Sequence, residues 1–584
     1  MTGHRPTVWV PVAAQVELSR RGEDARTALV AGGDGWWTAP EELAGGTDYL
    51  LHLDGGPGRP DPRSGWQPHG VHDATRVYDP TGFRWTDGDW RGRSSLGAVI
   101  YELHVATFTG AGTFDAAIER LDHLVDLGVD MVELMPVAPF PGEHGWGYDG
   151  VSLYAVHDPY GGPAGLQRFV DAAHARDLAV CLDVVYNHLG PAGNYLAEFG
   201  PYFTDRHHTP WGWAVNLDGP DAGPVRDYLI GNALRWLRDF HIDALRLDAV
   251  HALIDDSPRH LLAELSDAVA ELSEQVGRPL SLIAESDLND ARMVTPTADG
   301  GLGMTAQWDD DVHHALHARL TGERHGYYVS FGPTEVLRQA IDEVFVHAGS
   351  YSEFRGKVWG APVPADVDAR RFVVFAQNHD QVGNRAVGDR PSRVLDDGQL
   401  AVSAALVILG PFTPMLFMGE EWGARTPFQY FTDHDAELGE AIRRGRTAEF
   451  SSHGWTEIYG GDVEVPDPQS PATVEASRLD WSEPSRPRHA RMLRFYRDLI
   501  GLRRAEPEVA SGERSATRVD TDPAGRWLVL RRGSVAVVVN LDAATVEVDL
   551  GAPVGETLLG WSGDAVVNGS TVGLPGHDVL VVRC

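Results

Sequence analysis

The sequence is poor in the residues on which several kinds of chemistry depend. Its 584 residues include two cysteines, Cys181 and Cys584, and one lysine, Lys357. Two distant cysteines cannot build a disulfide framework or a zinc cluster, and a single lysine leaves little room for Schiff-base or pyridoxal chemistry. We therefore predict no cofactor and a location in the reducing cytoplasm.

Long apolar runs are also missing. No stretch approaches the roughly 18 apolar residues of a membrane span. The first residues, Met1–Pro6, do not form a basic stretch that leads into an apolar core. We expect a soluble protein that is not exported and has no membrane partner.

Positive charge is scarce. Lysine and arginine number 49 against 84 aspartate and glutamate residues, which gives a net charge of −35. Such a balance repels nucleic acid at long range, so we expect no nucleic-acid partner. The length is too great for one core and predicts two to four domains. No oligomeric state is predicted.

The pattern of apolar and turn residues divides the chain into three parts. Residues 1–90 show short alternating stretches broken by glycine and proline, which predict an N-terminal β-sandwich, immunoglobulin-like and similar to a carbohydrate-binding module. Residues 91–508 alternate apolar strands with amphipathic helices, as βα units around a parallel sheet do. Residues 509–584 return to β character and predict a C-terminal all-β domain.

Eight apolar stretches of the middle part are expected to be strands: 99–105, 131–137, 179–186, 244–250, 280–284, 304–308, 371–376 and 413–418. Helical spacing is found at 114–127, with Thr113 as N-cap, and at 225–240, 258–276 and 490–504. Eight βα units over about 400 residues indicate a closed (β/α)8 barrel with long loop insertions.

Polar residues close four of these strands: Asp183 to His188 the third, Arg246 to His251 the fourth, Glu285 the fifth and Asn378 to Gln381 the seventh. Active sites of such barrels lie at the C-terminal ends of the strands. Glycoside hydrolysis needs one protonated and one ionised carboxyl group. Carboxylates therefore recur where this chemistry requires them.

Asp248 and Glu285 close neighbouring strands, which lie about 4.8 Å apart. Their carboxyl groups could meet at the roughly 5–5.5 Å separation of retaining glycosidases. Arg246 shares a strand face with Asp248 and would hold it ionised. Asp380 would bind sugar hydroxyls and raise the pKa of Glu285. We predict a retaining mechanism, with His188, His251 and His379 as hydroxyl ligands.

Aromatic residues gather in the loops, at Trp146 and Tyr148, at Trp211 and Trp213, and at Phe428, Tyr430 and Phe431. Sugar faces stack on such rings, and we predict that Tyr148 is a sugar platform. Trp36 and Trp37 are expected to be core residues. A hydrolytic metal centre is the competing interpretation. The first strand offers only Glu102-Leu-His104, without a His-x-His pair, and we predict no metal.

The segments Asp183–His188, Arg246–His251, Ala284–Ser286 and Asn378–Asp380 resemble, in order and content, the signature regions of the α-amylase superfamily. The resemblance implies that Asp248 is the nucleophile, Glu285 the proton donor and Asp380 the transition-state stabiliser. It also implies that Tyr148, His188, Arg246 and His379 shape the first sugar subsite. Some members bind calcium through the asparagine that matches Asn187, but the other ligands of such a site are not found in this chain.

A narrower resemblance, carried by Leu53–Ser64, Gln307–His314, Asn378–Arg385 and Pro427–His434, is to the maltooligosyltrehalose trehalohydrolase family. It implies hydrolysis of the α-1,4 bond next to the terminal trehalose unit of maltooligosyltrehalose or a related α-glucan. It adds His251, Gln381 and Asn384 as substrate contacts, and Asp311, His313 and His314 as contacts on the leaving-group side. Ala244 stands where that family is expected to have glycine.

Two other functions compete with hydrolysis. A glycogen branching enzyme resembles the chain in its N-terminal part, barrel and acid pair, but transfers the glycosyl intermediate to another glucan. The Asp248–His251 and Tyr430–Asp433 segments argue against it. A non-catalytic glucan-binding protein would not need the intact carboxylate set.

Overall fold

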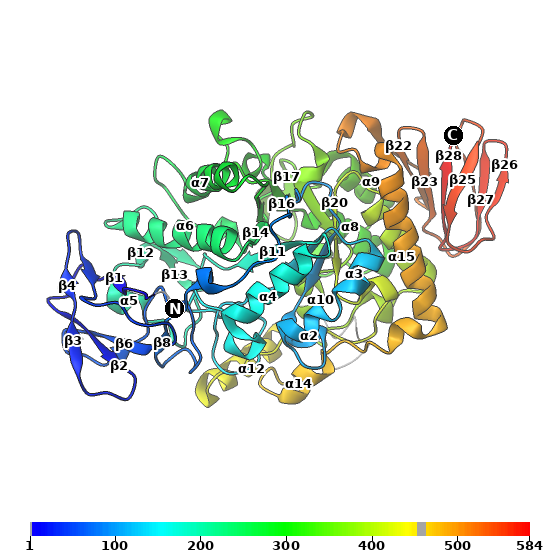
Figure 1. Cartoon of the computed structure of the whole chain (residues 1–584). Helices are drawn as coiled ribbons and strands as arrows, with labels where there is room; N and C mark the ends of the chain where they lie inside the picture. The colour runs from blue at the N-terminus through cyan, green and yellow to red at the C-terminus, as the bar shows by residue number, and fades with distance from the viewer. Residues whose placement is uncertain (1–2, 453–458, 460–462) are drawn as a thin grey trace.

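The computed structural model describes residues 3–452, 459 and 463–584. The chain runs from an N-terminal β region at one end of the molecule, through a central barrel, to C-terminal β-sheets at the other end (Figure 1). Helix α15 (Pro487–Ala505) lies between the barrel and the C-terminal sheets. The predicted boundaries at residues 90 and 508 stay predictions.

The centre of the molecule is a closed barrel of eight parallel strands. Their order around the barrel is β10 (Met131–Leu134), β11 (Ala179–Val184), β14 (Ala244–Leu247), β15 (Ser281–Ala284), β16 (Ala306–Trp308), β19 (Phe372–Phe375), β20 (Thr413–Phe417) and β9 (Ile100–Leu103). Each lies within one of the eight predicted stretches, so the predicted (β/α)8 fold is confirmed.

The barrel interior is built by every second residue of each strand, because side chains alternate between the two faces of a strand. Its apolar layer consists of Ile100, Met131, Ala179, Cys181, Ala244, Ile283, Ala306, Trp308, Val373, Phe375 and Met415. Two residues further along β9, β10, β11 and β14, the same face carries Glu102, Glu133, Asp183 and Arg246. The interior therefore changes from apolar to charged towards the C-terminal ends of the strands.

The helices between the strands largely follow the predicted spacing. α6 (Ala222–Asp239), α7 (Leu261–Val276) and α15 confirm the predicted helices at 225–240, 258–276 and 490–504. The predicted helix at 114–127 is divided into α2 (Phe114–Ile118) and α3 (Leu121–Leu127). The N–H of Arg120 donates to the carbonyl of Ala117, three residues back, which tightens the turn and interrupts the α-helical ladder.

The ends of this divided segment are as predicted. The hydroxyl oxygen of Thr113 accepts a hydrogen bond from the Ala116 N–H at the start of α2. Gly128 ends α3 with a φ of 95°, which favours glycine. The remaining helices are α1 (Val105–Phe108), α4 (Gly162–His174), α5 (Leu196–Phe199), α8 (Asp310–Thr321), α9 (Thr334–Glu343), α10 (His379–Gly383), α11 (Asp397–Ile408), α12 (Ala436–Ser452), α14 (Pro471–Ala476) and α16 (Pro507–Ala510).

Antiparallel sheets flank the barrel at both ends of the chain. The N-terminal pair has the orders β1 (Thr7–Trp9), β5 (Trp36–Thr38), β4 (Val30–Ala31) and β3 (Arg26–Ala28), β2 (Val16–Arg20), β6 (Asp48–Leu53), β7 (Gly58–Arg59), with β8 (Thr75–Arg76) beside β6. Trp36 and Trp37 pack half-buried against the core, and the indole N–H of Trp37 donates to the Val10 carbonyl at 3.1 Å. They lie at the edge of the core, so the predicted core position is only partly met.

The C-terminal sheets have the orders β21 (Thr517–Thr521), β22 (Trp527–Arg532), β23 (Val535–Asn540), β28 (Val579–Arg583), β25 (Glu556–Gly560) and β24 (Val546–Asp549), β27 (Thr571–Leu574), β26 (Val566–Asn568). The predicted β character of both ends is thus confirmed.

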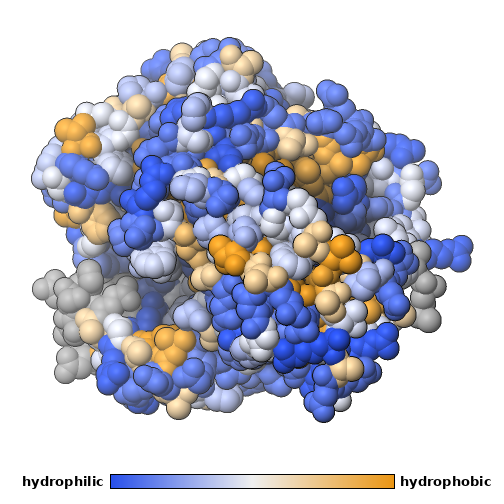
Figure 2. Space-filling model, turned by 90° about the vertical axis from the view of Figure 1, so that its left-hand side faces the viewer, coloured by the Kyte–Doolittle hydropathy of each residue, from blue (hydrophilic) through white to orange (hydrophobic). Residues whose placement is uncertain are grey.

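Two hairpins are inserted in the barrel loops. β12 (Phe203–Thr209) pairs with β13 (Gly212–Val215) between β11 and α6, and β17 (Ser350–Ser352) pairs with β18 (Lys357–Trp359) between α9 and β19. The face that carries the N-terminal sheets is mainly hydrophilic, with separate hydrophobic patches (Figure 2). Among the described residues, no helix combines the length and apolar character needed to cross a membrane.

We expect the Phe375→Ala variant to unfold more easily than the parent, because Phe375 is fully buried in the apolar layer of the barrel. Loss of a buried phenylalanine typically lowers the free energy of unfolding by about 3–5 kcal/mol. Calorimetry would register this as a lower melting temperature of the barrel transition. An unchanged transition would contradict the packing described for this layer.

Candidate active site

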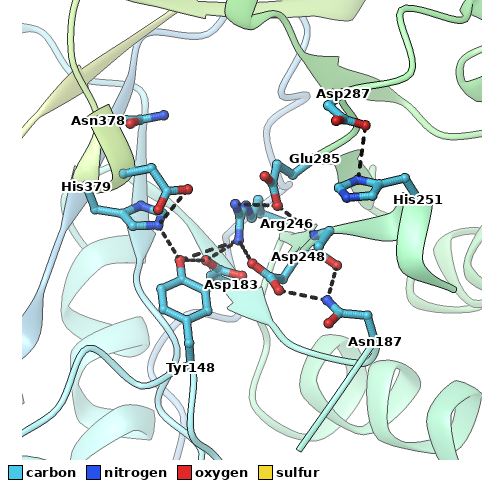
Figure 3. Close-up of polar contacts among 12 residues, drawn as sticks. Tyr148, Asp183, Asn187, Arg246, Asp248, His251, Glu285, Asp287, Asn378 and His379 are labelled. Atoms are coloured by element: carbon cyan, nitrogen blue, oxygen red, sulfur yellow. Dashed lines mark hydrogen bonds and ion pairs between the residues drawn. The ribbon is translucent and has the colours of Figure 1, made fainter. Parts of the chain in front are cut away.

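Arg246 occupies the centre of the polar end of the barrel. Its guanidinium Nη1 lies 2.7 Å from Asp183 Oδ2 and 2.9 Å from Asp248 Oδ1, and its Nη2 lies 3.0 Å from Glu285 Oε2. The group also stacks over the ring of Trp308, 4.2 Å from the ring centroid. One fully buried cation therefore joins carboxylates from three neighbouring strands (Figure 3).

Asp248 follows β14 and has both carboxylate oxygens occupied. Oδ1 accepts from Arg246, and Oδ2 accepts from Asn187 Nδ2 at 2.7 Å. The same amide nitrogen donates to the backbone carbonyl of Asp248. These contacts fix the carboxylate in one orientation.

Glu285 follows β15 and faces Asp248 across the guanidinium. Its Oε2 accepts from the backbone N–H of Ala249 at 2.6 Å. Ala249 has a φ of 39° and a ψ of 51°, the left-handed region that a residue with a side chain rarely adopts. This turn points the backbone N–H of Ala249 at the carboxyl group of Glu285.

The two carboxyl groups differ in environment. Burial raises the pKa of Glu285 to about 8, with Arg246 acting against the shift and the charges of Asp248 and Asp380 adding to it. Glu285 is therefore protonated at neutral pH. The predicted direction is confirmed, but burial is the larger cause and like-charge repulsion the smaller one.

His379 and Tyr148 form the opposite side of the site. The phenol of Tyr148 donates to Asp183 Oδ2 at 2.6 Å and lies 2.8 Å from Nε2 of His379. The two rings stack with their centroids 5.1 Å apart. Glu102 accepts hydrogen bonds from Nδ1 and from the backbone N–H of His379. Burial acts to lower the pKa of His379, but Glu102 and Asp380 raise it to about 9.

Asp380 lies in the first turn of α10, for which Asn378 is the N-cap. Its Oδ1 accepts from Asn384 Nδ2 at 3.2 Å, and its Oδ2 lies 3.5 Å from His379 Nε2. The side chain is 38% exposed. It is thus open to a ligand while its position is held by the helix.

A pocket opens beside Glu285, lined by Ser286, Asp287, Asn289, Asp310, Asp311, His314, Tyr327, Phe331, His347, Ser352, Phe354, Arg355 and Trp359. Arg355 donates to Asp287 at 2.8 Å, and its guanidinium stacks on Trp359 of the β17–β18 hairpin. Burial and the neighbouring Asp380, Asp311 and Asp287 raise the pKa of Asp310 to about 7. The pocket combines aromatic walls with charged and neutral hydrogen-bonding groups.

The structure brings most of the predicted residues together. Tyr148, His188, Arg246, Asp248, Glu285, His379 and Asp380 come from five strand ends and loops of one face. Gln381 and Asn384 reach Asp310 and Asp380. His251 lies at the edge, 3.6 Å from Asp287, and His314 lines the pocket.

Two of the residues predicted to contact the leaving group, His313 and Asp311, form hydrogen bonds within the protein. The ring nitrogens of His313 contact the Ala376 carbonyl and the Tyr328 hydroxyl, and the side chain is fully buried. Asp311 Oδ2 accepts from Asn289 Nδ2 and from two backbone N–H groups of the loop at 346–347. Their role as contacts on the leaving-group side stays a prediction, and Asp311 is one of the residues that line the pocket beside Glu285.

The loop aromatics serve two different purposes. Trp146 and Phe428 are buried and stack on each other, so they support the loops from inside. Trp211 and Trp213 are 49% and 62% exposed, and Trp211 stacks on His188 with an interplanar angle of 3°. Only the second pair presents free ring faces.

Sequence reasoning missed the pocket side chains Asp310, Tyr327, Phe354, Arg355 and Trp359. Asp310 stands within an acidic run at a strand end, a signal that could have found it. The aromatics and Arg355 lie on η6 (Gly326–Tyr328) and the β17–β18 hairpin, more than 40 residues from the acid in the sequence. Only folding brings them beside Glu285.

The described residues include one group with ligand atoms close enough for a metal ion, His207, Asp218 and Asp256. Its buried member, Asp218, already accepts from Arg206 and pairs with His207. Asn187, the candidate calcium ligand, donates its Nδ2–H to Asp248, and its Oδ1 contacts Nδ1 of His188.

A model of the α-amylase catalytic domain matches residues 79–219, and a domain of unknown function, DUF3459, matches residues 512–581. The chain is 53% identical to the malto-oligosyltrehalose trehalohydrolase of Arthrobacter ramosus over 99% of both chains. It is 50% identical to that of Mycobacterium tuberculosis over 99% of this chain and 98% of the relative.

More distant relatives carry other names. A 1,4-alpha-glucan branching enzyme of Geobacillus stearothermophilus is 30% identical over 60% of each chain. A solved structure of a Salmonella typhimurium protein assigned as an α-amylase has a TM-score of 0.89 at 37% identity, covering 99% of this chain and 97% of that one. A pullulanase from Paenibacillus barengoltzii shares the fold at 19% identity, with a TM-score of 0.72 and coverage of 99% and 93%.

We expect the Glu285→Gln variant to be more stable than the parent, by an amount that grows with pH. Between pH 4.5 and 8 the unfolded glutamate loses its proton while the folded one keeps it, so the parent loses stability as the pH rises. The slope is at most about 1.4 kcal/mol per pH unit. Melting temperatures of both proteins at pH 5, 6.5 and 8 would show it. A difference that does not change with pH would contradict the raised pKa.

Proposed function

The chain belongs to the malto-oligosyltrehalose trehalohydrolase family of the α-amylase superfamily, and from this premise we propose how its residues carry out the reaction. The substrate is maltooligosyltrehalose, and the products are trehalose and a maltooligosaccharide. The observation that carries the proposal is the position of Asp248 and of a protonated Glu285 on either side of Arg246.

Asp248 is proposed as the nucleophile, because hydrogen-bond donors hold both of its oxygens in one orientation. Glu285 is proposed as the acid that protonates the leaving oxygen, because it keeps a proton at neutral pH. Asp380 is proposed to stabilise the oxocarbenium-like transition state, since it is exposed to the site and next to the cationic His379.

We propose retention of the anomeric configuration because the carboxyl groups of Asp248 and Glu285 lie close to each other. A single guanidinium contacts both carboxyl groups at 2.9 and 3.0 Å. This supports the short separation, roughly 5–5.5 Å, that leaves no room for a water molecule between them. Asp248 would form a covalent glycosyl intermediate, and Glu285, having lost its proton to the leaving group, would then activate water.

The pocket beside Glu285 is proposed as the trehalose site. The leaving group receives its proton from Glu285, so it must lie on the side of that residue. There Tyr327, Phe354 and Trp359 offer rings for sugar faces, and Asp287, Asp310 and Arg355 offer hydrogen bonds. The glucan chain would extend to the other side, past Tyr148 and the exposed Trp211.

Hydrolysis is favoured over branching by overall similarity. Relatives named trehalohydrolases match almost the full chain at about 50% identity, whereas the branching enzyme matches 60% of it at 30%. The reaction releases trehalose, and we place the protein in trehalose biosynthesis. A cytoplasmic location is supported by Cys584, an exposed free thiol.

We expect purified enzyme to release trehalose from maltotriosyltrehalose much faster than it cleaves maltopentaose, because only the first substrate presents trehalose to the pocket beside Glu285. Chromatography of the products over time would measure both rates. Formation of α-1,6 branches on amylose, or equal rates on both substrates, would overturn the proposed function.

The Glu285→Gln variant should bind this substrate but turn it over at least 100-fold more slowly, since proton donation typically contributes 10²–10⁴ in rate. In the parent, kcat should fall as the pH rises through about 8, where Glu285 loses its proton. Steady-state kinetics from pH 5 to 10 would test both statements. Undiminished turnover by the variant would remove Glu285 from the role of acid.

Replacing Phe354 by alanine should raise KM for maltotriosyltrehalose and reduce its preference over maltopentaose, because Phe354 lines the proposed trehalose pocket. Tyr351→Ala is the matched control: this aromatic residue lies on the same hairpin, is 61% exposed and does not line the pocket. Equal effects of the two changes would argue against the pocket as the trehalose site.

A further inference from the structure

Glu102 is a fully buried carboxylate that the proposed roles do not use. It lies on β9, at the other side of the barrel interior from Glu285, and its side chain is 1% exposed. Both of its oxygens are directed to one residue: Oε1 accepts from the ring Nδ1 of His379, and Oε2 accepts from the backbone N–H of His379 at 2.9 Å. Such a two-point contact fixes both the position and the ring orientation of the histidine.

The hydrogen bonds beyond His379 form a chain in which the protons have only one consistent arrangement. Asp183 is an acceptor, so the Tyr148 hydroxyl donates to it at 2.6 Å. That hydroxyl has a single proton, and it must therefore accept from His379 Nε2 at 2.8 Å. Asp183 is in turn paired with Arg246, which donates to Asp248.

This arrangement requires protons on both ring nitrogens of His379. Nδ1 faces the carboxylate of Glu102 and must donate. Nε2 faces the oxygen of Tyr148, whose single proton is already donated to Asp183, and must also donate. A neutral ring could satisfy only one of these contacts. The Tyr148 proton would then turn towards His379, and Asp183 would lose a donor.

We propose that Glu102 is a positioning residue that keeps His379 doubly protonated and thereby fixes the direction of the hydrogen-bond chain from His379 through Tyr148 and Asp183 to the Arg246–Asp248 pair. The inference rests on the proposed function, in which Asp248 is the nucleophile. Glu102 touches no reacting atom and acts through His379.

The groups that face this contact are consistent with the assignment. From the neighbouring strand β10, Glu133 is paired in register with Glu102, and burial raises its pKa to about 8, so it adds no charge at neutral pH. Asp183 on β11 is paired with Arg246 on β14. Asp380 on α10 lies 3.5 Å from Nε2 of His379 and favours the same cationic ring.

The test compares Glu102→Gln with Glu133→Gln. Both residues are buried inward-facing glutamates on adjacent strands, but none of the hydrogen bonds of the described residues joins Glu133 to His379. We expect Glu102→Gln to lower kcat/KM on maltotriosyltrehalose by about 10- to 100-fold, as loss of the group that orients a histidine commonly does. In the parent Glu285 loses its proton before His379 does. In Glu102→Gln the alkaline limb should move below about pH 8, because His379, without Glu102, then loses its proton first. Glu133→Gln should keep the parent rate and profile up to about pH 8.

A double-mutant cycle separates action through His379 from a general effect on the fold. In a His379→Gln background the further change Glu102→Gln should have almost no effect on kcat/KM, because the two residues act as one unit. Glu102→Asp, which keeps the charge, should return the alkaline limb towards that of the parent. Melting temperatures check that each variant is folded. If Glu102→Gln does not fold, the cycle is run with Glu102→Asp.

Three results would overturn the inference: an unshifted alkaline limb in Glu102→Gln, an equal shift in Glu133→Gln, or additive effects in the cycle. Failure of the parent enzyme to release trehalose would instead overturn the proposed function. The cycle would then be measured on whichever α-glucan the parent cleaves, so the two failures remain distinct.

Discussion

The active site depends on one buried guanidinium group. Arg246 has no contact with solvent, yet it lies within 3.0 Å of Asp183, Asp248 and Glu285. Burying a cation is costly unless it is paired, and so is burying carboxylates. The cost of burying each of these groups is therefore offset by the pairing with the others. Replacing Arg246 would leave several anions facing one another inside the barrel.

The surplus of acid over base around Arg246 explains why the carboxyl groups do not share one protonation state. The interior and its rim hold Glu102, Glu133, Asp183, Asp248, Glu285 and Asp380, and in the described part of the chain the cations that contact these residues are Arg246 and His379. Asp248 accepts hydrogen bonds at both of its carboxylate oxygens. Glu133 and Glu285 are buried, have fewer donors and keep their protons at neutral pH. The proposed division between nucleophile and acid thus rests on unequal hydrogen bonding of similar side chains.

The backbone turn at Ala249 contributes to the different hydrogen bonding of Asp248 and Glu285. Ala249 takes up a left-handed conformation directly after Asp248, and its N–H then points at Glu285. Strain of this kind typically costs about 1–3 kcal/mol and persists only where the surroundings hold it. Here the neighbouring backbone bonds between Val250 and Glu285 and between Asp248 and Val184 hold the turn. The barrel therefore stabilises a turn that the isolated segment would not adopt.

Sequence reasoning reached the parts of the molecule that strand periodicity controls. The eight strands and the residues that end them could be predicted, because a parallel barrel collects its strand ends on one face. The division of the predicted helix at 114–127 could not, since it depends on one turn at Arg120. The family resemblance implied Asp311 and His313 as contacts on the leaving-group side, but a sequence does not tell which donors will meet a buried side chain. The same limit hid Glu102, whose partner His379 is 277 residues away in the chain.

The specificity of such a site must come from outside the barrel strands. In the proposed mechanism Asp248, Glu285 and Asp380 act on the bond that is cleaved, and they do not determine which sugars lie beyond the leaving oxygen. Groups that touch the second and third sugar would determine this, and we propose that η6, α8 and the β17–β18 hairpin supply them around the pocket beside Glu285. Substitutions in the loops that form the pocket can therefore alter the pocket without altering the barrel strands. The same carboxylate set can therefore serve hydrolases and transferases, while the loops decide which glucan end is accepted.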